Sequence, residues 1–214
     1  MPYHNMRANL RYYHYRGCKF LSKNILSMEK LEQKIGNSEN CEQLMGIEWN
    51  IHQYYYEGWK NIDTALDFGK RVRRPPNNPV NCLISFLNQM TYAIVRHELF
   101  KTHLDENFSF LHAVTNGRSS LSLDISETFK PILADQLIFR LYRKNIVTEN
   151  WFNQYEGICL LSETGRRHVV EHFAQRLEER YSERSYREWI YRECLALERH
   201  VLGIDEYQSF KRRV

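Results

Sequence analysis

Three side chains that could bind a metal ion occur close together between residues 108 and 131. His112 ends a short apolar run, and Asp124 and Glu127 lie three residues apart in a segment with helical periodicity. Residues i and i+3 of a helix share a face, so the two carboxylates are expected to point the same way. A further acid, Glu48, lies within the aromatic stretch MGIEWNIHQYYY, where a charge needs a partner. These four residues are the candidate ligands.

One imidazole with two or three carboxylates is a hard, oxygen-rich ligand set. Such a set suits Mg²⁺ or Mn²⁺, and the nitrogen ligand favours Mn²⁺. Sites of this kind keep open water positions, so they can bind phosphate oxygens and activate a hydroxyl. Spacing alone leaves a second interpretation open. Acids in the first turns of a helix stabilise its dipole, and His112 would then be a buried, hydrogen-bonded group.

The elements that must position these residues are almost all helices. Gly and Pro are sparse, and the apolar residues recur mostly at three- and four-residue spacing. Pro131 lies inside one helical pattern, so a kink is expected just after Glu127. Helices are predicted over 4–16, 20–35, from Asn37 or Ser38 to about 68, from Asn78 onward, from Ser119 or Ser120 to about Lys144, 162–181 and 185–202. Only residues 148–161 resemble a strand pair, so the predicted fold is all-α with one minor β-hairpin.

Composition limits the class of protein. The chain has 214 residues, enough for one sizeable core. Five scattered cysteines form no CxxC pair, which favours reduced thiols and excludes a paired cysteine metal site. No apolar run is long enough to span a membrane and no signal peptide is apparent, so we expect a cytoplasmic protein without membrane contact. The net charge of +4 permits nucleic-acid binding without requiring it. The KRVRR run at 70–74 is either a phosphate contact or a solvated linker.

Four stretches resemble, in order and approximate spacing, the CRISPR-associated integrases of the Cas-one family, which insert new spacers into CRISPR arrays. They are GIEWNIHQYYYEGW, RRPPNNPVNCLISFLNQMTYAIV, FLH and SLSLDISETFKPILAD, and the resemblance extends through YREWIYRECLALERHVLG. The chain is most similar to the version from type I systems, subtype I-B. In that family a small N-terminal β domain precedes a larger helical catalytic domain.

The resemblance implies that the β domain is missing here and that residues 1–214 form a single helical catalytic domain. Within it, residues 1–36 would be helices near the hinge, 37–147 the metal-site core and 148–214 the C-terminal helices.

The resemblance also implies roles for individual residues. Glu48 matches the family's catalytic glutamate, His112 its histidine ligand and Glu127 its third ligand. Asp124 matches an acid beside the metal. Two further residues could line the pocket, namely Asn81, with an orienting role, and Tyr92, for which core packing is the alternative. The residues expected to contact DNA phosphates, or otherwise to be solvated charges, are Lys70, Arg71, Arg73, Arg74, Arg118 and Lys130.

The implied activity is that of a metal-dependent DNA endonuclease and integrase that acts by 3′-hydroxyl transesterification, with Mg²⁺ or Mn²⁺ as cofactor. The implied partners are double-stranded DNA (protospacer and CRISPR repeat), the small protein Cas-two and a second copy of the chain. A different function remains open, that of a truncated and catalytically inactive helical module for DNA binding or oligomerisation. An activity assay with metal separates the two.

Overall fold

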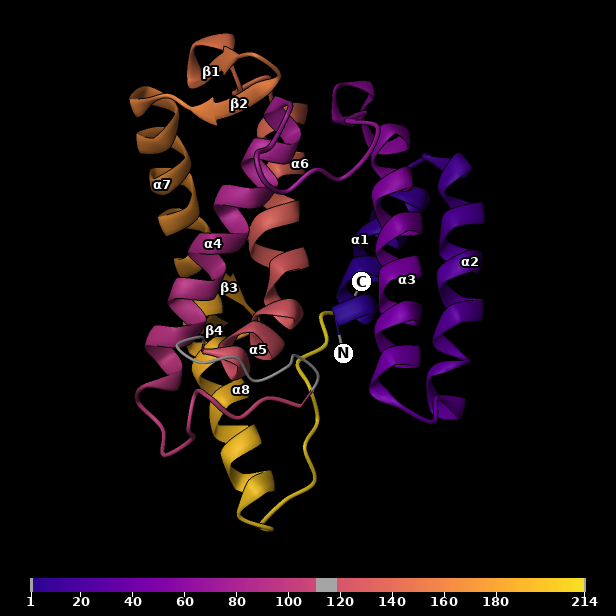
Figure 1. Ribbon diagram of the computed structural model, residues 1–214, viewed down its shortest axis with the longest axis vertical. Coiled ribbons are helices and arrows are strands. Elements are labelled where there is room, and N and C mark those ends of the chain that lie inside the picture. Colours follow the sequence, from indigo (N-terminus) through magenta and orange to yellow (C-terminus); the bar gives the residue numbers. More distant parts are fainter. Residues whose placement is uncertain (1, 111–118, 214) are drawn as a thin grey trace.

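Three N-terminal helices lie along one flank of the molecule (Figure 1). The computed structural model describes residues 2–110 and 119–213. The three helices are α1 (Pro2–Tyr15), α2 (Ser22–Glu32) and α3 (Cys41–Ile62). The side chain of Asn40 caps α3 by accepting a hydrogen bond from the Gln43 N–H. This helix ends before the predicted limit near 68, since a separate 3₁₀ turn, Thr64–Leu66, follows it.

The central helices follow in the chain. The sequence predicts the N-cap of the first of them and the interruption between the second and the third. They are α4 (Pro79–Leu99), α5 (Ser120–Lys130) and α6 (Gln136–Arg143). Asn78 caps α4 by accepting a hydrogen bond from the Asn81 N–H, and Pro79 occupies the first turn, where its missing N–H costs nothing.

A π-helical turn, Pro131–Asp135, joins α5 to α6. Pro131 has no N–H to donate to the carbonyl of Glu127, so the regular i to i+4 pattern is interrupted there. The pattern shifts by one residue, and the Gln136 N–H donates to the Pro131 carbonyl. The kink expected after Glu127 is therefore one turn of π-helix, a feature that is frequent at functional sites.

The remaining elements include two small antiparallel hairpins. They are β1 (Phe152–Tyr155), β2 (Ile158–Leu161), α7 (Glu163–Glu178), β3 (Arg180–Tyr181), β4 (Arg184–Ser185) and α8 (Tyr186–Val201). The β1–β2 pair, with Phe152 opposite Leu161, is the hairpin predicted within 148–161. The β3–β4 pair is not predicted, because its turn contains no glycine or asparagine and places Ser182 at a φ of 58°.

An aromatic contact fixes the N-terminal helices against the central ones. The rings of Trp59 on α3 and Phe139 on α6 meet edge to face with their centroids 4.7 Å apart, and both side chains are fully buried. Tyr13 on α1 packs against the same Phe139 ring at 5.6 Å. Burying a large apolar side chain contributes about 1.5–3 kcal/mol, so this cluster holds α3 firmly beside the α5–α6 segment.

The predicted all-α fold class is confirmed, and the residues that the structure describes add a second hairpin to the predicted one. Over the described ranges, no helix combines the length and the apolar character that crossing a membrane requires.

Candidate metal centre

Side chains from α3 and α5 converge on a half-buried site. Glu48 and His52 are one turn apart on α3, and the His52 Nε2 lies 3.9 Å from the Glu48 Oε1. Glu127 reaches the same point from α5, with its Oε2 4.0 Å from the His52 Nε2. The side chains of Glu48, His52 and Glu127 are 20%, 20% and 15% exposed. One ligand atom from each lies within 4.8 Å of the others. The structure therefore brings together two of the predicted ligands, Glu48 and Glu127.

The two separations that involve the imidazole are compatible with a single divalent cation. Mg²⁺ binds oxygen at about 2.1 Å, so two atoms on the same ion lie at most about 4.2 Å apart. The separations of 3.9 and 4.0 Å from the imidazole fall within that limit. Two carboxylates with one imidazole also form the oxygen-rich donor set that suits Mg²⁺ or Mn²⁺.

Burial favours a neutral His52 imidazole. Burial lowers the pKa of His52, while the Glu127 carboxylate opposes that shift. A neutral ring keeps a nitrogen lone pair, which is the form that binds a metal. The Lys130 Nζ pairs with the Glu127 Oε1, one turn further along α5. Lys130 thus lies beside the site, as expected, and it offsets part of the negative charge there.

Asp124 lies one turn before Glu127 and has a structural contact. Its Oδ2 accepts a hydrogen bond from the Phe110 N–H at 2.7 Å. This contact ties α5 to the end of the segment that follows α4. Among the described residues, Asp124 does not belong to the group of three ligand atoms. His112 and Arg118 lie outside the described residues, so their predicted roles stay predictions.

Asn81 and Arg71 organise the segment before α4. Asn81 is fully buried, and its Oδ1 accepts hydrogen bonds from the Val72 N–H at 3.1 Å and from the Arg71 Nη1 at 3.0 Å. Its Nδ2 donates to the Lys70 carbonyl at 3.0 Å. Arg71 also donates to the Ser85 Oγ at 3.0 Å. Asn81 thus fixes the conformation of the segment before α4, and Arg71 donates hydrogen bonds within the protein, while its predicted DNA contact stays a prediction.

The other predicted residues lie nearer the surface. Lys70, Arg73 and Arg74 are exposed and available to a large ligand. Tyr92 is partly buried on α4 and donates a hydrogen bond from its hydroxyl to the Ser119 carbonyl at 3.1 Å, where α5 begins. Its hydroxyl therefore has the partner that a packed tyrosine requires.

His52 is the residue of the site that the sequence reasoning missed. The spacing of Glu48 and His52, i and i+4 on a predicted helix, places both on one face and could have revealed the pair. In this aromatic stretch only the charge of Glu48 was considered, and His52 was given no role.

A buried carboxyl group lies behind the centre. The Asp135 Oδ2 accepts a hydrogen bond from the Tyr55 hydroxyl at 3.0 Å, and that hydroxyl accepts one from the Asn9 Nδ2 at 2.9 Å. Tyr55 is one turn beyond His52 on α3. Burial raises the pKa of Asp135 to about 7, with the Tyr55 hydrogen bond opposing the shift and Glu127 adding to it. The carboxyl group of Asp135, next to the candidate metal centre, is thus expected to lose its proton only near neutral pH.

Asp135→Asn should reduce the pH dependence of folding stability between about pH 4 and pH 7. In that range folded Asp135 retains a proton that the unfolded chain has lost, so stability falls as pH rises. Below the range both states are protonated and above it both are ionised, so the effect is constant. Urea unfolding at three pH values across this range measures it, with Asp205→Asn at an exposed carboxylate as control. Equal slopes for wild type and Asp135→Asn would contradict the assignment.

Two glutamates and a histidine that meet between two helices define a candidate divalent-metal centre on a helical scaffold. The family model described as CRISPR associated protein Cas1 matches residues 2–175, so the chain belongs to the Cas1 family, the integrase family that its sequence resembles.

A curated relative from Fusobacterium nucleatum subsp. nucleatum, named CRISPR-associated endonuclease Cas1, is 41% identical over 214 residues. The match covers 97% of this chain and 63% of the relative, so the chain spans less than two thirds of that protein.

Solved structures share the fold. A Cas1 protein from Thermotoga maritima superposes with a TM-score of 0.84 at 31% identity, covering 98% of this chain and 67% of that one. A chain of a Cas6-RT-Cas1–Cas2 complex gives a TM-score of 0.87 over 100% of this chain and 24% of that chain. At 21% identity, the second likeness concerns the fold alone.

Proposed function

We propose that this chain carries the catalytic centre of a metal-dependent DNA endonuclease and integrase that inserts spacers into CRISPR arrays. The observation that carries the proposal is the convergence of Glu48 and Glu127, from separate helices, on His52. Membership of the Cas1 family and the endonuclease name of the Fusobacterium relative support the reaction class. Residues 1–214 would act as one helical catalytic domain with its metal-site core in 37–147.

The proposed reaction is a transesterification. The 3′-hydroxyl oxygen of an incoming DNA end attacks a backbone phosphorus at the repeat boundary. A new phosphorus–oxygen bond forms as the bond to the 3′ oxygen of the target strand breaks, so the number of phosphodiester bonds is unchanged. The attacking hydroxyl releases its proton to solvent, and the leaving oxygen takes one up. With water as the attacking group, the same site would cut DNA.

The residues of the centre would share these tasks. Glu48 and Glu127 would hold Mg²⁺ or Mn²⁺, with His52 or His112 as the nitrogen ligand. The bound cation would supply charge stabilisation at the phosphate and favour loss of the attacking proton. Lys130, which pairs with Glu127, would turn its ammonium group towards the bound phosphate.

DNA would be held mainly through its phosphates. The exposed Lys70, Arg73 and Arg74 are proposed contacts, and Arg71 and Arg118 are further proposals. Double-stranded protospacer and repeat DNA, Cas2 and a second copy of the chain are the proposed partners. The Cas2 proposal is supported by the fold shared with a chain of the Cas6-RT-Cas1–Cas2 complex.

A strand-joining assay tests the proposal. The purified chain is incubated with a labelled DNA end that has a free 3′-hydroxyl and with a plasmid that carries a CRISPR repeat. We expect joined or nicked product with Mn²⁺ or Mg²⁺ and none after EDTA removes the metal. A DNA end blocked at its 3′-hydroxyl is the control and should give no joined product. Product that persists in EDTA, or a folded chain that forms no product with either metal, would contradict the proposal.

A further inference from the structure

A basic hollow lies apart from the metal centre. It has a volume of about 370 Å³ and opens between α1, α6, α7 and the C-terminal segment. The residues that line it are Asn9, Tyr12, Tyr13, Gln136, Arg140, Arg143, Lys144, Arg176 and Arg212. None of the three residues of the candidate metal centre is among them, so the hollow is a separate feature.

The hollow has a strong positive charge. Five of its lining residues are cations, and among the described residues that line it none is acidic. Glu179 lies next to it and pairs with both Arg140 and Arg176. In the part of the chain that the structure describes, no carboxylate forms a salt bridge with Arg143, Lys144 or Arg212. Among the described residues, Glu179 is therefore the only carboxylate that forms salt bridges with the five lining cations.

Helix ends alone do not explain this charge. Cations in the last turn of a helix stabilise its dipole, which accounts for Arg143 and Lys144 at the end of α6. Arg176, however, comes from α7, and Arg212 from the segment after α8. The Arg212 N–H donates to the Asn5 Oδ1 on α1 at 3.0 Å, which fixes this segment beside the hollow. Three separate parts of the chain thus bring cations to one place.

Aromatic rings lie among the cations. Tyr12 is 37% exposed, and the Arg16 guanidinium lies over its ring, 4.3 Å from the centroid. The Arg143 guanidinium lies 5.1 Å from the centroid of the Tyr13 ring, which is buried against Phe139, so Tyr12 is the ring of this pair that a base could reach. Cations that follow a phosphate backbone, with aromatic rings on which bases stack, are the combination by which proteins hold single nucleic-acid strands.

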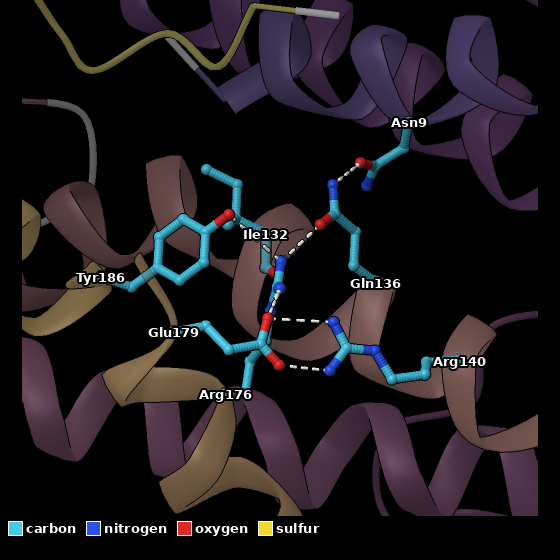
Figure 2. Close-up of polar contacts among 7 residues, drawn as sticks. All are labelled: Asn9, Ile132, Gln136, Arg140, Arg176, Glu179 and Tyr186. Carbon is cyan, nitrogen blue, oxygen red and sulfur yellow. Dashed lines mark hydrogen bonds and ion pairs between the residues drawn. The ribbon is translucent and has the colours of Figure 1, made fainter. Parts of the chain in front are cut away.

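A hydrogen-bonded network makes the floor of the hollow rigid. Figure 2 shows the Arg176 guanidinium between Glu179, Gln136 and the Ile132 carbonyl. The Arg176 Nη2 donates to the Ile132 carbonyl at 3.0 Å, and its side chain is only 4% exposed. The Arg140 Nη2 donates to the Glu179 Oε2 at 3.0 Å. Arg176 is thus a buried support of the floor, whereas Arg140, which is 39% exposed, is held in place by Glu179 before any ligand arrives, which lowers the entropic cost of binding.

We propose that this hollow binds the phosphodiester backbone of a single DNA strand, as a second DNA contact separate from the metal centre. The inference rests on the proposed function, because DNA is the polyanion that this function handles. Phosphate is also present in free nucleotides. Arg16, outside the lining, extends the basic surface beyond the hollow, which favours a strand over a nucleotide.

The test is the binding of fluorescein-labelled single-stranded oligothymidylate, measured by anisotropy in EDTA so that no metal contributes. Arg143→Glu combined with Lys144→Glu should weaken binding by about tenfold or more and lower the salt dependence of log Kd by about one to two units. The control is Lys23→Glu with Lys30→Glu, which changes the net charge equally at exposed positions on α2 and should change Kd by less than about threefold. Circular dichroism confirms that both variants fold.

The binding experiment has results that would overturn the strand proposal. Equal affinity of the two double variants, or no binding by the wild type, would overturn it. Unlabelled thymidine monophosphate should compete far less well than the oligonucleotide, and equal competition would assign the hollow to a nucleotide and overturn the strand proposal. The joining assay is read separately. If the wild type forms metal-dependent product but Arg143→Glu/Lys144→Glu binds the oligonucleotide normally, only this inference is removed. If that double variant alone loses binding and the wild type forms no product, only the proposed function is removed.

Discussion

Glu48→Gln is expected to abolish tight Mn²⁺ binding and to lower metal-dependent cutting or joining of DNA by about a hundredfold or more. Glutamine keeps the shape of the side chain but removes the negative charge that holds a hard cation. Changing a group that merely orients a metal ligand already costs about 10- to 100-fold, so loss of a direct ligand should cost more. Mn²⁺ binding is followed by electron paramagnetic resonance, which does not depend on activity.

The matched control for Glu48 lies on the same helix. Glu57 is exposed on α3, and Glu57→Gln makes the same chemical change away from the site. It should bind Mn²⁺ like the wild type. Both variants should bind DNA within about threefold of the wild type, since DNA affinity comes mainly from cationic contacts. Unchanged Mn²⁺ affinity in Glu48→Gln would exclude this carboxylate from the centre. The same titration on His52→Gln and His112→Gln assigns the imidazole ligand.

The carboxylates of the centre were the part of the site most open to prediction. Glu127 has helical spacing to Asp124, and Glu48 is a charge in an aromatic helix, so periodicity and desolvation made both candidates, and the family resemblance then assigned them the role of metal ligands. Asp124 accepts a hydrogen bond from the backbone N–H of Phe110. No pattern of side chains in the sequence predicts such a contact with the backbone. Spacing along a helix therefore showed which acids share a face but not which of them anchors the backbone.

The basic residues were predicted less well. The KRVRR run reads as a uniform cationic segment, but the buried amide of Asn81 turns Arg71 inward and leaves Arg73 and Arg74 outside. The basic hollow was not predicted, because its cations lie on α6, α7 and the C-terminal segment and meet only after the chain has folded.

In the fold, too, local signals were predictable and contacts between distant segments were not. Local signals such as Asn78 with Pro79 at the start of α4 were read correctly. Pro131 indicated a kink, but the resulting π-turn is stabilised by distant side chains. The Asn9 Nδ2 donates to the Pro131 carbonyl at 2.8 Å, and Arg176 donates to the Ile132 carbonyl. The exact form of the break was set by these tertiary contacts.

Arg176→Ala is expected to lower the free energy of unfolding by about 3 kcal/mol, because the guanidinium is buried and several groups depend on it. The Ile132 carbonyl would lose two side-chain donors, at 3.2 and 3.0 Å, and the Gln136 Oε1 would lose one. Gln136 in turn donates from its Nε2 to the Asn9 Oδ1 at 2.5 Å, so the connection from α7 to α1 would weaken as well. The Tyr186 ring, over which the guanidinium lies, would lose a packing partner.

Arg140→Ala provides the comparison, because Arg140 shares the Glu179 carboxylate but its side chain is 39% exposed. Solvent replaces an exposed partner at little cost, so this variant should lose about 1 kcal/mol or less. Urea unfolding of both variants at one pH measures the difference, and Arg176→Met, which keeps most of the volume, separates lost hydrogen bonds from lost packing. Equal destabilisation by Arg176→Ala and Arg140→Ala would mean that the Glu179 ion pairs, and not the bonds to the π-turn, stabilise this part of the molecule. The expected excess for Arg176 would show instead that α7 stabilises the turn that follows Glu127, and so helps to hold α5 in the position from which it completes the metal centre.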